Sequence, residues 1–167
     1  MVVILVCTPC VWAVDPDMVL IPGGDFEMGD HHDGISYSLP VHTVTLDSFY
    51  MSKYTITNQN YRDYLNDANS LGQIKVVDGL VYASSDDSNS YPFFSTSSAP
   101  TDYPYYGEYS QIDYSDNTFS VKVRDSFSMS NHPVIVVNWY GAVVYCNWRS
   151  QQEGYEQCYN LSTWACD

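Results

Sequence analysis

Short apolar runs, each ended by a turn, are the feature that most constrains how this chain can fold. Segments of this length are typical of strands joined by tight turns, where glycine is favoured because it has no Cβ atom. The runs are Met18–Ile21 before Pro22-Gly23-Gly24, then Phe26 and Met28 before Gly29, and then Val41–Leu46. We therefore expect several short strands, and we expect the strand at 41–46 to have two partly buried faces.

A first helix is predicted to start at Thr57, whose hydroxyl can cap the free amides of the first turn. Tyr61, Tyr64 and Leu65 then share one face at helical spacing. Residues 66–69, with the sequence Asn-Asp-Ala-Asn, are expected to end this helix.

A second helix is predicted from Trp139 to about Glu153, with Asn138 as its cap and Gly154 as its stop. The β-branched run His132–Val137, which precedes it, is predicted as a buried strand. The apolar face of this second helix is expected to hold Trp139, Ala142, Val143 and Cys146. Two helices among short strands predict a loop-rich α+β fold, and 167 residues suit one domain.

A stretch rich in Ser, Asp and Tyr at about 83–117 predicts a long acidic excursion on the surface. It separates Leu80–Tyr82 from Phe119–Val123, which we expect to pair as strands. Within it, the segment Asp86-Asp87-Ser88-Asn89 offers oxygen ligands for Ca²⁺. The segment lacks the fixed spacing of a calcium loop, so a solvated turn is the better interpretation.

The charge balance limits the classes of partner. The sequence has six Lys plus Arg residues and 20 Asp plus Glu residues, which gives a formal net charge of −14. Such a surface repels the phosphates of nucleic acids and the headgroups of anionic membranes. We therefore expect no nucleic acid partner. The apolar run near the N-terminus is too short to span a bilayer, so no membrane span is expected, and the expected partner is an unknown protein or carbohydrate ligand.

Residues 1–13 predict a signal peptide and hence a secreted or periplasmic protein. Val2–Val6 is an apolar run, and Val11-Trp12-Ala13 has small residues at the two positions that a signal peptidase inspects. Met1 is followed directly by Val2, with no basic residue between them. Either the true start lies upstream or the leader is atypical.

Removal of that leader would leave three cysteines, Cys146, Cys158 and Cys166. Cys158 and Cys166 bracket a short loop, which predicts a structural disulfide in an oxidising compartment. Cys146 is then either a small buried hydrophobe of the second helix or the partner of a cysteine outside this sequence.

Four stretches, taken in order, resemble the formylglycine-generating enzyme family, also called sulfatase-modifying factors. They are Met18–Gly29 with Gly23, Gly24, Met28 and Gly29; Pro40–Leu46 with His42 and then Phe49-Tyr50-Met51; Tyr54–Tyr61 with Thr57 and Asn58; and His132-Pro133-Val134 with Val137-Asn138-Trp139, Ala142, Tyr145-Cys146 and Trp148. The resemblance covers most of residues 18–150. It implies a C-type-lectin-like fold of the formylglycine-generating type, of which residues 14–167 form the N-terminal part.

In catalytic members of that family, a copper-binding cysteine pair near the end of the domain oxidises a substrate cysteine to formylglycine, and later loops hold calcium. The resemblance implies that these ligands lie beyond Asp167, so no catalytic residue and no cofactor is assigned within this chain. Cys158 and Cys166 differ from the pair in spacing and neighbours.

The remaining histidines are interpreted as structural residues more than as catalytic residues or metal ligands. His42 lies inside an alternating strand and His132 precedes Pro133, so both are interpreted as scaffold residues. His31-His32-Asp33 is a weaker metal candidate because three adjacent loop residues have no further ligand nearby.

Three hypotheses follow from the sequence. The first is an exported fragment of a formylglycine-generating-enzyme-like domain without catalytic residues of its own. The second is an extracellular, non-catalytic C-type-lectin-like binding module, and the third is part of an active copper-dependent oxidase. We also expect an incomplete domain of this type to expose sheet edges and to be marginally stable.

Overall fold

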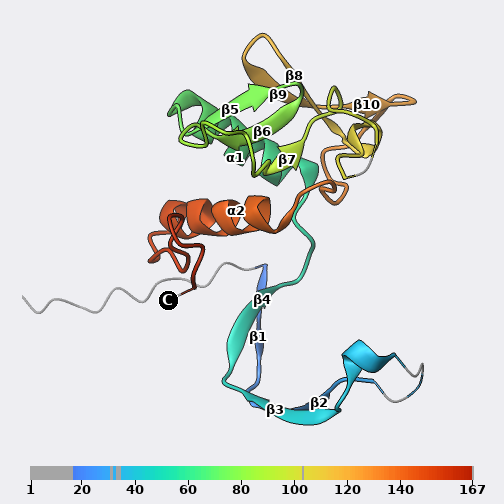
Figure 1. Ribbon diagram of the computed structural model, residues 1–167, viewed down its shortest axis with the longest axis vertical. Coiled ribbons are helices and arrows are strands. Elements are labelled where there is room, and N and C mark those ends of the chain that lie inside the picture. The colour runs from blue at the N-terminus through green and yellow to red at the C-terminus, as the bar shows by residue number, and fades with distance from the viewer. Residues whose placement is uncertain (1–16, 31, 33–34, 103, 167) are drawn as a thin grey trace, which may run out of the picture. The chain divides into compact units, whose positions relative to one another are not determined.

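The computed structural model describes residues 17–30, 32, 35–102 and 104–166, and the chain divides into two compact units, 1–54 and 55–167 (Figure 1). Helices and several small antiparallel sheets make up the described residues, which confirms an α+β chain. The predicted leader at 1–13 lies outside the described residues.

The described residues of the N-terminal unit form two antiparallel ribbons and one short 3-10 helix. β1 (Met18–Ile21) pairs with β4 (Phe49–Ser52), and β2 (Gly24–Met28) pairs with β3 (His42–Leu46). The 3-10 helix η1 spans Ser36–Ser38. Two cross-strand hydrogen bonds of 2.6 Å, from Thr43 to Glu27 and from Thr45 to Asp25, reinforce the β2–β3 ribbon.

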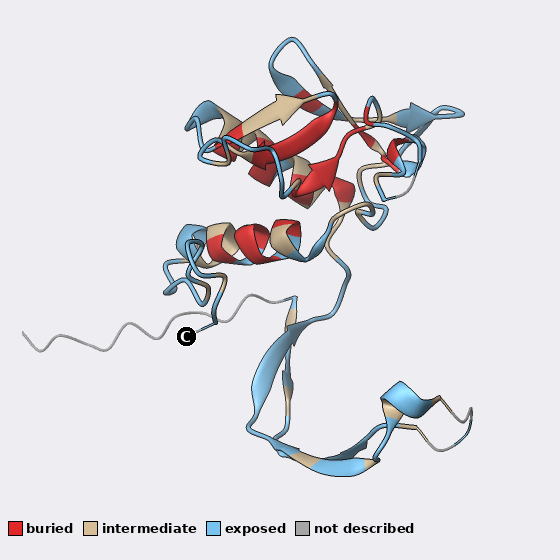
Figure 2. Cartoon of the chain, viewed as in Figure 1, coloured by how far each residue is buried: buried red, intermediate tan, exposed pale blue. Residues whose placement is uncertain are grey.

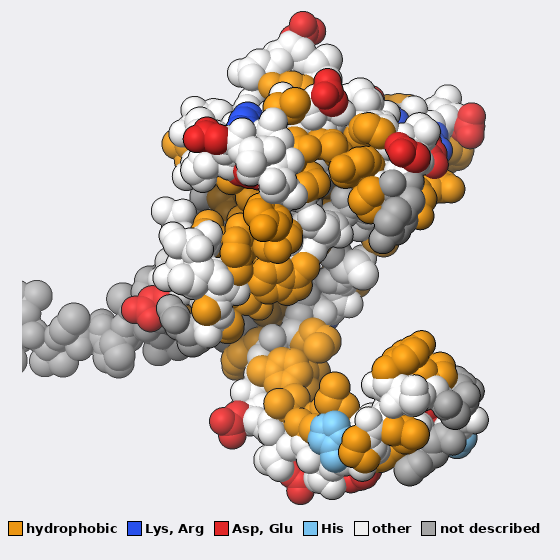
Figure 3. Space-filling model, viewed as in Figure 1, with side chains coloured by type: hydrophobic (Ala, Val, Ile, Leu, Met, Phe, Trp, Pro, Cys, Tyr) orange, Lys and Arg blue, Asp and Glu red, His pale blue; other side chains and the backbone are white. Residues whose placement is uncertain are grey.

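The apolar side chains of this unit are largely exposed, as Figures 2 and 3 show. Val44 is half-buried, but Phe26 and Leu46 are each 46% exposed and Met28 is 53% exposed. The prediction of two partly buried faces for 41–46 is therefore wrong for most of the strand. A two-stranded ribbon has no second layer of its own to cover its side chains.

The C-terminal unit contains the core of the chain. Its elements are α1 (Asn58–Ser70), β5 (Ile74–Val77), β6 (Leu80–Ala83), β7 (Phe94–Ser95), η2 (Gly107–Tyr109), β8 (Ile112–Ser115), β9 (Thr118–Val121), β10 (Val123–Arg124), β11 (Phe127–Ser128) and α2 (Trp139–Gln152). β5, β6 and β7 form one antiparallel sheet, and β8–β9 and β10–β11 are separate hairpins.

Two-residue turns with positive φ close three of these hairpins. They are Asp78-Gly79, Asp116-Asn117 and Asp125-Ser126, with φ values between 48° and 76°. Turns of this kind match the twist of the strands they join, and Asp, Asn and Gly tolerate the left-handed conformation. The second turn makes Phe119 pair with Tyr114, so the predicted pairing of 80–82 with 119–123 is wrong.

The stretch at 83–117 is not a surface excursion throughout. Phe93, Phe94 and Ile112 are 4%, 2% and 0% exposed and belong to the main core. β7 within this stretch pairs with β6, which brings the two phenylalanines inward. The predicted strand at 132–137 is also not regular: it makes isolated bridges only, and Val136 has a φ of 56°.

The start of α1 agrees with the prediction in detail. The hydroxyl of Thr57 accepts the N–H of Asn60 at 3.2 Å, and the Asn60 side chain accepts the N–H of Thr57 at 3.1 Å. This reciprocal arrangement is a capping box. Tyr61, Tyr64 and Leu65 are buried at 1%, 3% and 0% exposure, as expected, and the helix continues to Ser70.

The ends of α2 also agree with the prediction, but its buried face does not. Asn138 accepts the N–H of Gly141 at 2.9 Å, and Gly154 follows the helix with a φ of 77°. Of the predicted face, Val143 is buried, whereas Ala142 and Cys146 are exposed and Trp139 is 53% exposed. The buried residues of α2 are Gly141, Val143, Val144, Tyr145 and Asn147. Contact with α1 decides this face, since Tyr145 stacks on Tyr61 with ring centres 5.5 Å apart.

Neither helix in the described part of the chain combines the length and apolar character needed to cross a membrane. An aromatic cluster instead accounts for much of the core. The ring of Tyr61 lies 5.3 Å from Tyr64 and 5.2 Å from Phe94, a spacing typical of favourable aromatic pairs.

Candidate functional site

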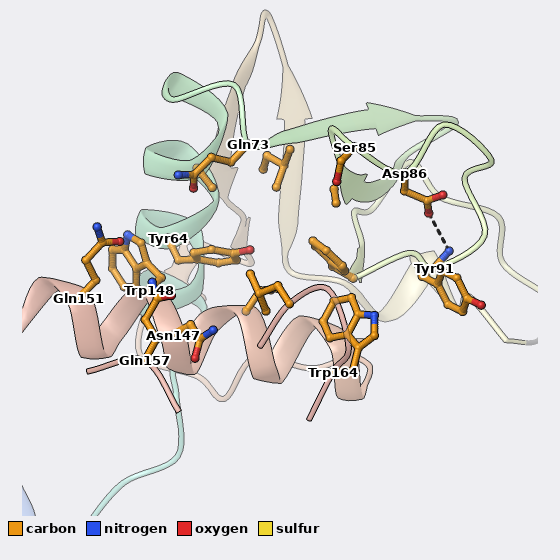
Figure 4. Close-up of a pocket in the computed structure, with 16 residues that line it drawn as sticks. Tyr64, Gln73, Ser85, Asp86, Tyr91, Asn147, Trp148, Gln151, Gln157 and Trp164 are labelled. Atoms are coloured by element: carbon orange, nitrogen blue, oxygen red, sulfur yellow. Dashed lines mark hydrogen bonds between the residues drawn. The ribbon is translucent and has the colours of Figure 1, made fainter. Parts of the chain in front are cut away.

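The C-terminal unit encloses a cavity of about 510 Å³ (Figure 4). This volume lies in the range of about 300–1,000 Å³ that small-molecule sites occupy. Its lining residues come from α1 and the turn after it, the β5–β6 hairpin, the segment between β6 and β7, α2 and the segment after α2. They are Tyr64, Ala68, Gln73, Ile74, Ala83, Ser85, Asp86, Tyr91, Phe93, Val144, Asn147, Trp148, Gln151, Gln157, Leu161 and Trp164.

Aromatic rings make up much of the cavity wall. Tyr64 of α1 and Trp148 of α2 lie with ring centres 5.6 Å apart, and Phe93 and Trp164 lie 6.2 Å apart. The indole N–H of Trp148 donates to Asp67 at 2.7 Å, which fixes the orientation of the ring. Burial raises the pKa of the Tyr64 phenol, so its hydroxyl stays protonated at neutral pH.

One carboxylate and several amides supply the polar groups of the cavity. Asp86 accepts the backbone N–H groups of Ser90 at 2.9 Å and Tyr91 at 3.0 Å, and it accepts the hydroxyl of Ser88 at 2.8 Å. The Tyr91 N–H, followed by the Ser88 hydroxyl, lowers the pKa of Asp86, so this group is ionised at neutral pH. Figure 4 shows Asp86 and Tyr91 on one side of the cavity and Gln151 on the other.

The segment after α2 contributes Gln157, Leu161 and Trp164 to the wall, and a buried side chain attaches it to the helix. Asn147, 2% exposed, donates to the Tyr159 carbonyl at 2.7 Å and accepts the Tyr159 N–H at 3.1 Å. The Asn147 amide thus bonds to both backbone groups of Tyr159, as a neighbouring strand would, and this holds the segment in place.

The sequence did not single out this cavity. Tyr64 was predicted as a core residue and Trp148 only as part of a family motif, whereas Gln157 and Trp164 carried no signal of their own. The cavity forms where segments distant in the chain meet, and periodicity within one segment does not report that.

Two of the predicted motifs come together in the C-terminal unit. Asn58 donates its backbone N–H to the His132 carbonyl at 2.9 Å and its side-chain amide to the Met129 carbonyl at 2.8 Å. Thr57 and Pro133 form an antiparallel bridge. These four predicted residues thus join the start of α1 to the segment before α2, away from the cavity lining.

Other predicted scaffold residues lie in the N-terminal unit. A Cβ atom at Gly23 would lie 2.8 Å from the Ser48 nitrogen, so this turn requires glycine, whereas a Cβ at Gly24 would meet nothing within 4 Å. Gly29 has a φ of +120° and follows Met28 at the end of β2. His42 Nδ1 lies 2.9 Å from the Pro40 carbonyl oxygen.

The structure does not confirm the predicted Cys158–Cys166 disulfide, because Cys158 carries a free thiol. The reason is the local register: Cys166 lies opposite Tyr159 in an antiparallel bridge. Side chains alternate along a strand, so Cys158 points away from the side that Cys166 faces. Cys146 is an exposed residue of α2 and not the buried hydrophobe considered from the sequence.

The metal candidates give no site in the described residues. Within these residues, no three His, Cys, Asp or Glu side chains come together in a way that could hold a metal ion. The carboxylate of Asp86 is engaged in its own turn by the three donors above. His31 and Asp33 lie outside the described residues.

Comparison with known proteins defines the class of this α+β chain with an aromatic cavity. A family model described as "Sulfatase-modifying factor enzyme 1-like domain" matches residues 11–165. The chain is 30% identical over 145 residues to the formylglycine-generating enzyme of Mus musculus and 28% identical over 144 residues to that of Bos taurus. Each alignment covers 81% of this chain and 36% of the relative.

A serine/threonine-protein kinase of Chlamydia pneumoniae is 29% identical over 133 residues, which cover 79% of this chain and 16% of that protein. The match at 11–165 shows that the chain belongs to the family of sulfatase-modifying factor enzyme 1-like domains. It spans about a third of the length of the two formylglycine-generating enzymes, 36% in each case.

Proposed function

We propose that this chain is an exported part of a formylglycine-generating-enzyme-like domain with a C-type-lectin-like fold, and that it binds a ligand without supplying catalytic residues. The observation that supports this proposal is the cavity of about 510 Å³, whose wall combines aromatic rings with several polar side chains. Such a composition is typical of binding sites.

The ligand that suits this cavity best is a neutral carbohydrate. A pyranose ring presents a C–H face that packs on aromatic rings, and its hydroxyls accept from amide N–H groups and donate to amide and carboxylate oxygens. Tyr91 and Trp164 offer ring surfaces, and Asp86 and Gln157 offer hydrogen-bonding groups. An ionised Asp86 and a net charge of −14 disfavour anionic sugars.

The names of the mouse and bovine relatives favour a second candidate, in which the chain is part of a copper-dependent oxidase that forms formylglycine. Within the described residues, no group of three metal-ligating side chains comes together, and the family resemblance assigns no residue of this chain to copper or calcium. We therefore derive no catalytic step through this part of the chain. In that candidate, the cavity would serve to hold a substrate while the chemistry occurs elsewhere in a longer protein.

Fluorescence titration of the full chain tests the binding proposal. The probes are the methyl glycosides of neutral hexoses and N-acetylhexosamines, with a methyl glycoside of glucuronic acid as the anionic comparison. Tyr91→Ala removes a cavity ring that is 51% exposed, and Tyr109→Ala removes a tyrosine of similar exposure, 55%, outside the cavity. The pair therefore separates the site from general effects of surface aromatics.

A saturable response to a neutral glycoside is expected, weakened about tenfold by Tyr91→Ala and unchanged by Tyr109→Ala. Tenfold corresponds to about 1.4 kcal/mol, which is in the range of one aromatic contact. The proposal is wrong if no neutral glycoside gives a saturable response, or if the two variants weaken binding equally.

A further inference from the structure

Cys146 of α2 and Cys158 of the segment after it occupy matching positions beside one structural clamp. The clamp is the pair of hydrogen bonds between the Asn147 side chain and the Tyr159 backbone, at 2.7 and 3.1 Å. Cys146 directly precedes Asn147, and Cys158 directly precedes Tyr159. The clamp therefore places one cysteine on each of the two segments that it joins, and both cysteines are exposed.

The electrostatics of the two thiols agree with this placement. Partial burial and, second to it, the neighbouring Cys158 thiol raise the pKa of Cys146. An interaction of this kind weakens with distance, so it agrees with the position of the two cysteines on the two segments that the clamp joins. Both residues are nevertheless exposed, so a small oxidant in solution can reach them.

The alternative partner of Cys158 is less well placed. Cys166 lies opposite Tyr159, and the hydrogen bond from the Asn160 N–H to the Ala165 carbonyl at 2.9 Å maintains that register. Alternation of side chains then directs Cys158 away from Cys166. Formation of a Cys158–Cys166 bond would require the register to change.

We propose that Cys146 and Cys158 are a redox-sensitive pair that closes to a disulfide and fixes the segment after α2 to the helix. The oxidant is a low-molecular-weight disulfide such as oxidised glutathione. The Cys158 thiolate attacks one of its sulfurs and releases one thiolate of the small molecule. Deprotonated Cys146 then attacks Cys158 in the mixed disulfide and releases the second, so two electrons pass to the small disulfide and two protons leave the protein thiols.

Closure of this pair would stabilise one wall of the cavity. Gln157, Leu161 and Trp164 belong to the segment that Cys158 anchors, and all three line the cavity. The oxidised chain therefore holds these residues in place with a covalent bond, whereas the reduced chain depends on the Asn147 clamp and on the ring contacts of Trp164 with Phe93 and Tyr140. The pairing itself does not depend on the ligand proposed above, so either proposal can fail alone.

Disulfide mapping in a glutathione redox buffer tests the proposal. The full chain is used with Cys7→Ser and Cys10→Ser, so that only Cys146, Cys158 and Cys166 react. After oxidation and quenching with an alkylating agent, the chain is digested without reduction and its linked peptides are identified by mass. The same reaction in guanidinium chloride is the reference, and hydrogen exchange of residues 157–164 is the second readout.

In the native chain, a peptide linking Cys146 to Cys158 is expected to dominate and to persist in Cys166→Ser. In denaturant, the shorter Cys158–Cys166 loop is expected to form about twice as often as the Cys146–Cys158 loop, because closing a short loop costs less entropy. Oxidation is expected to slow exchange of residues 157–164 in the native chain but not in Cys146→Ser. A native Cys158–Cys166 peptide, the absence of any intramolecular disulfide, or the same products in both solvents would overturn the proposal.

Asn147 has a positioning role in this proposal, and two matched variants test it. Asn147→Ala is expected to slow formation of the Cys146–Cys158 bond about tenfold, because the effective concentration of the two thiols falls when the segment is released. Asn66→Ala removes a similar clamp on Phe119 elsewhere in the unit and is expected to leave the rate unchanged. Equal rates in all three chains would show that the clamp does not position the cysteines.

Discussion

Replacement of Asn147 by alanine is expected to release the segment after α2 while the rest of the C-terminal unit stays folded. The side chain is 2% exposed, and its two hydrogen bonds with Tyr159 attach the segment to the helix. Tyr159 itself is half-buried, so its freed backbone groups can bond to water. The loss of stability is therefore mainly confined to the segment after α2.

The expected magnitude follows from the two bonds. Each contributes about 0.5–1.5 kcal/mol net, so their loss together costs about 2 kcal/mol. That value corresponds to an increase of about thirtyfold in the opening equilibrium of the segment. The global unfolding transition is expected to shift less, because the core around Tyr61 and Phe94 does not include this contact.

Amide hydrogen exchange followed by mass spectrometry or NMR measures the effect. The reporters are the N–H of Asn160, bonded to the Ala165 carbonyl at 2.9 Å, and the N–H of Trp164, bonded to the Asn160 carbonyl at 2.6 Å. Both are expected to exchange about thirtyfold faster in Asn147→Ala.

Asn66→Ala is the matched control. The Asn66 side chain donates to the Phe119 carbonyl at 2.9 Å and accepts the Phe119 N–H at 2.8 Å, so the variant loses the same bonds at β9. It is expected to speed exchange in the β8–β9 hairpin and to leave Asn160 and Trp164 unchanged. The reasoning is refuted if Asn147→Ala does not affect the two reporters, or if Asn66→Ala affects them equally.

Three further predictions concern stability. Thr57→Ala is expected to lower the free energy of unfolding by about 1 kcal/mol, because α1 loses its cap. An unchanged midpoint of urea denaturation would contradict the role of that cap. Gly79→Ala is expected to cost more than Gly72→Ala: both have positive φ, at +76° and +67°, but only at Gly79 would a Cβ clash with the Ala99 backbone. Similar denaturation midpoints for the two variants would refute the clash. Burial raises the pKa of Tyr64 above its ordinary value of about 10, so the stability it contributes is fully present below pH 10 and falls as pH rises toward the raised pKa. Tyr64→Phe is expected to unfold at higher pH than wild type when alkaline unfolding is followed by circular dichroism. An unchanged midpoint would show that ionisation of Tyr64 does not contribute to alkaline unfolding.

The ends of both helices could be predicted from the sequence because their causes are local. The Thr57 and Asn138 caps act within one turn, and Gly154 acts at the position where it stands. The buried face of α1 was predicted for a similar reason, since Tyr61, Tyr64 and Leu65 form a single aromatic and aliphatic stripe.

Family membership was also predicted from the sequence, and the match over residues 11–165 confirms it. Four motifs in the right order identify a family without any knowledge of how they pack. In the structure, two of those motifs meet through the Asn58–His132 hydrogen bond, a contact between residues far apart in the chain.

Strand partners and inward faces were decided by the tertiary structure. Apolar residues surround much of α2, so the choice of Tyr145 over Cys146 as an inward residue depends on the rings of α1 that it meets. The pairing of Phe119 depends on the Asp116-Asn117 turn, a short-range signal that the sequence contained and that the prediction did not use. Phe93 and Phe94 are buried because β7 joins β6.

The cavity and the cysteine arrangement belong to the tertiary structure alone. Spacing along the chain favours Cys158 with Cys166, because a short loop closes easily in an unfolded chain. The folded chain favours Cys146 instead, since the Asn147 clamp and the register opposite Tyr159 decide which side chains face each other. Sequence patterns report the preferences of one segment, whereas contacts between segments depend on the packing of the whole unit.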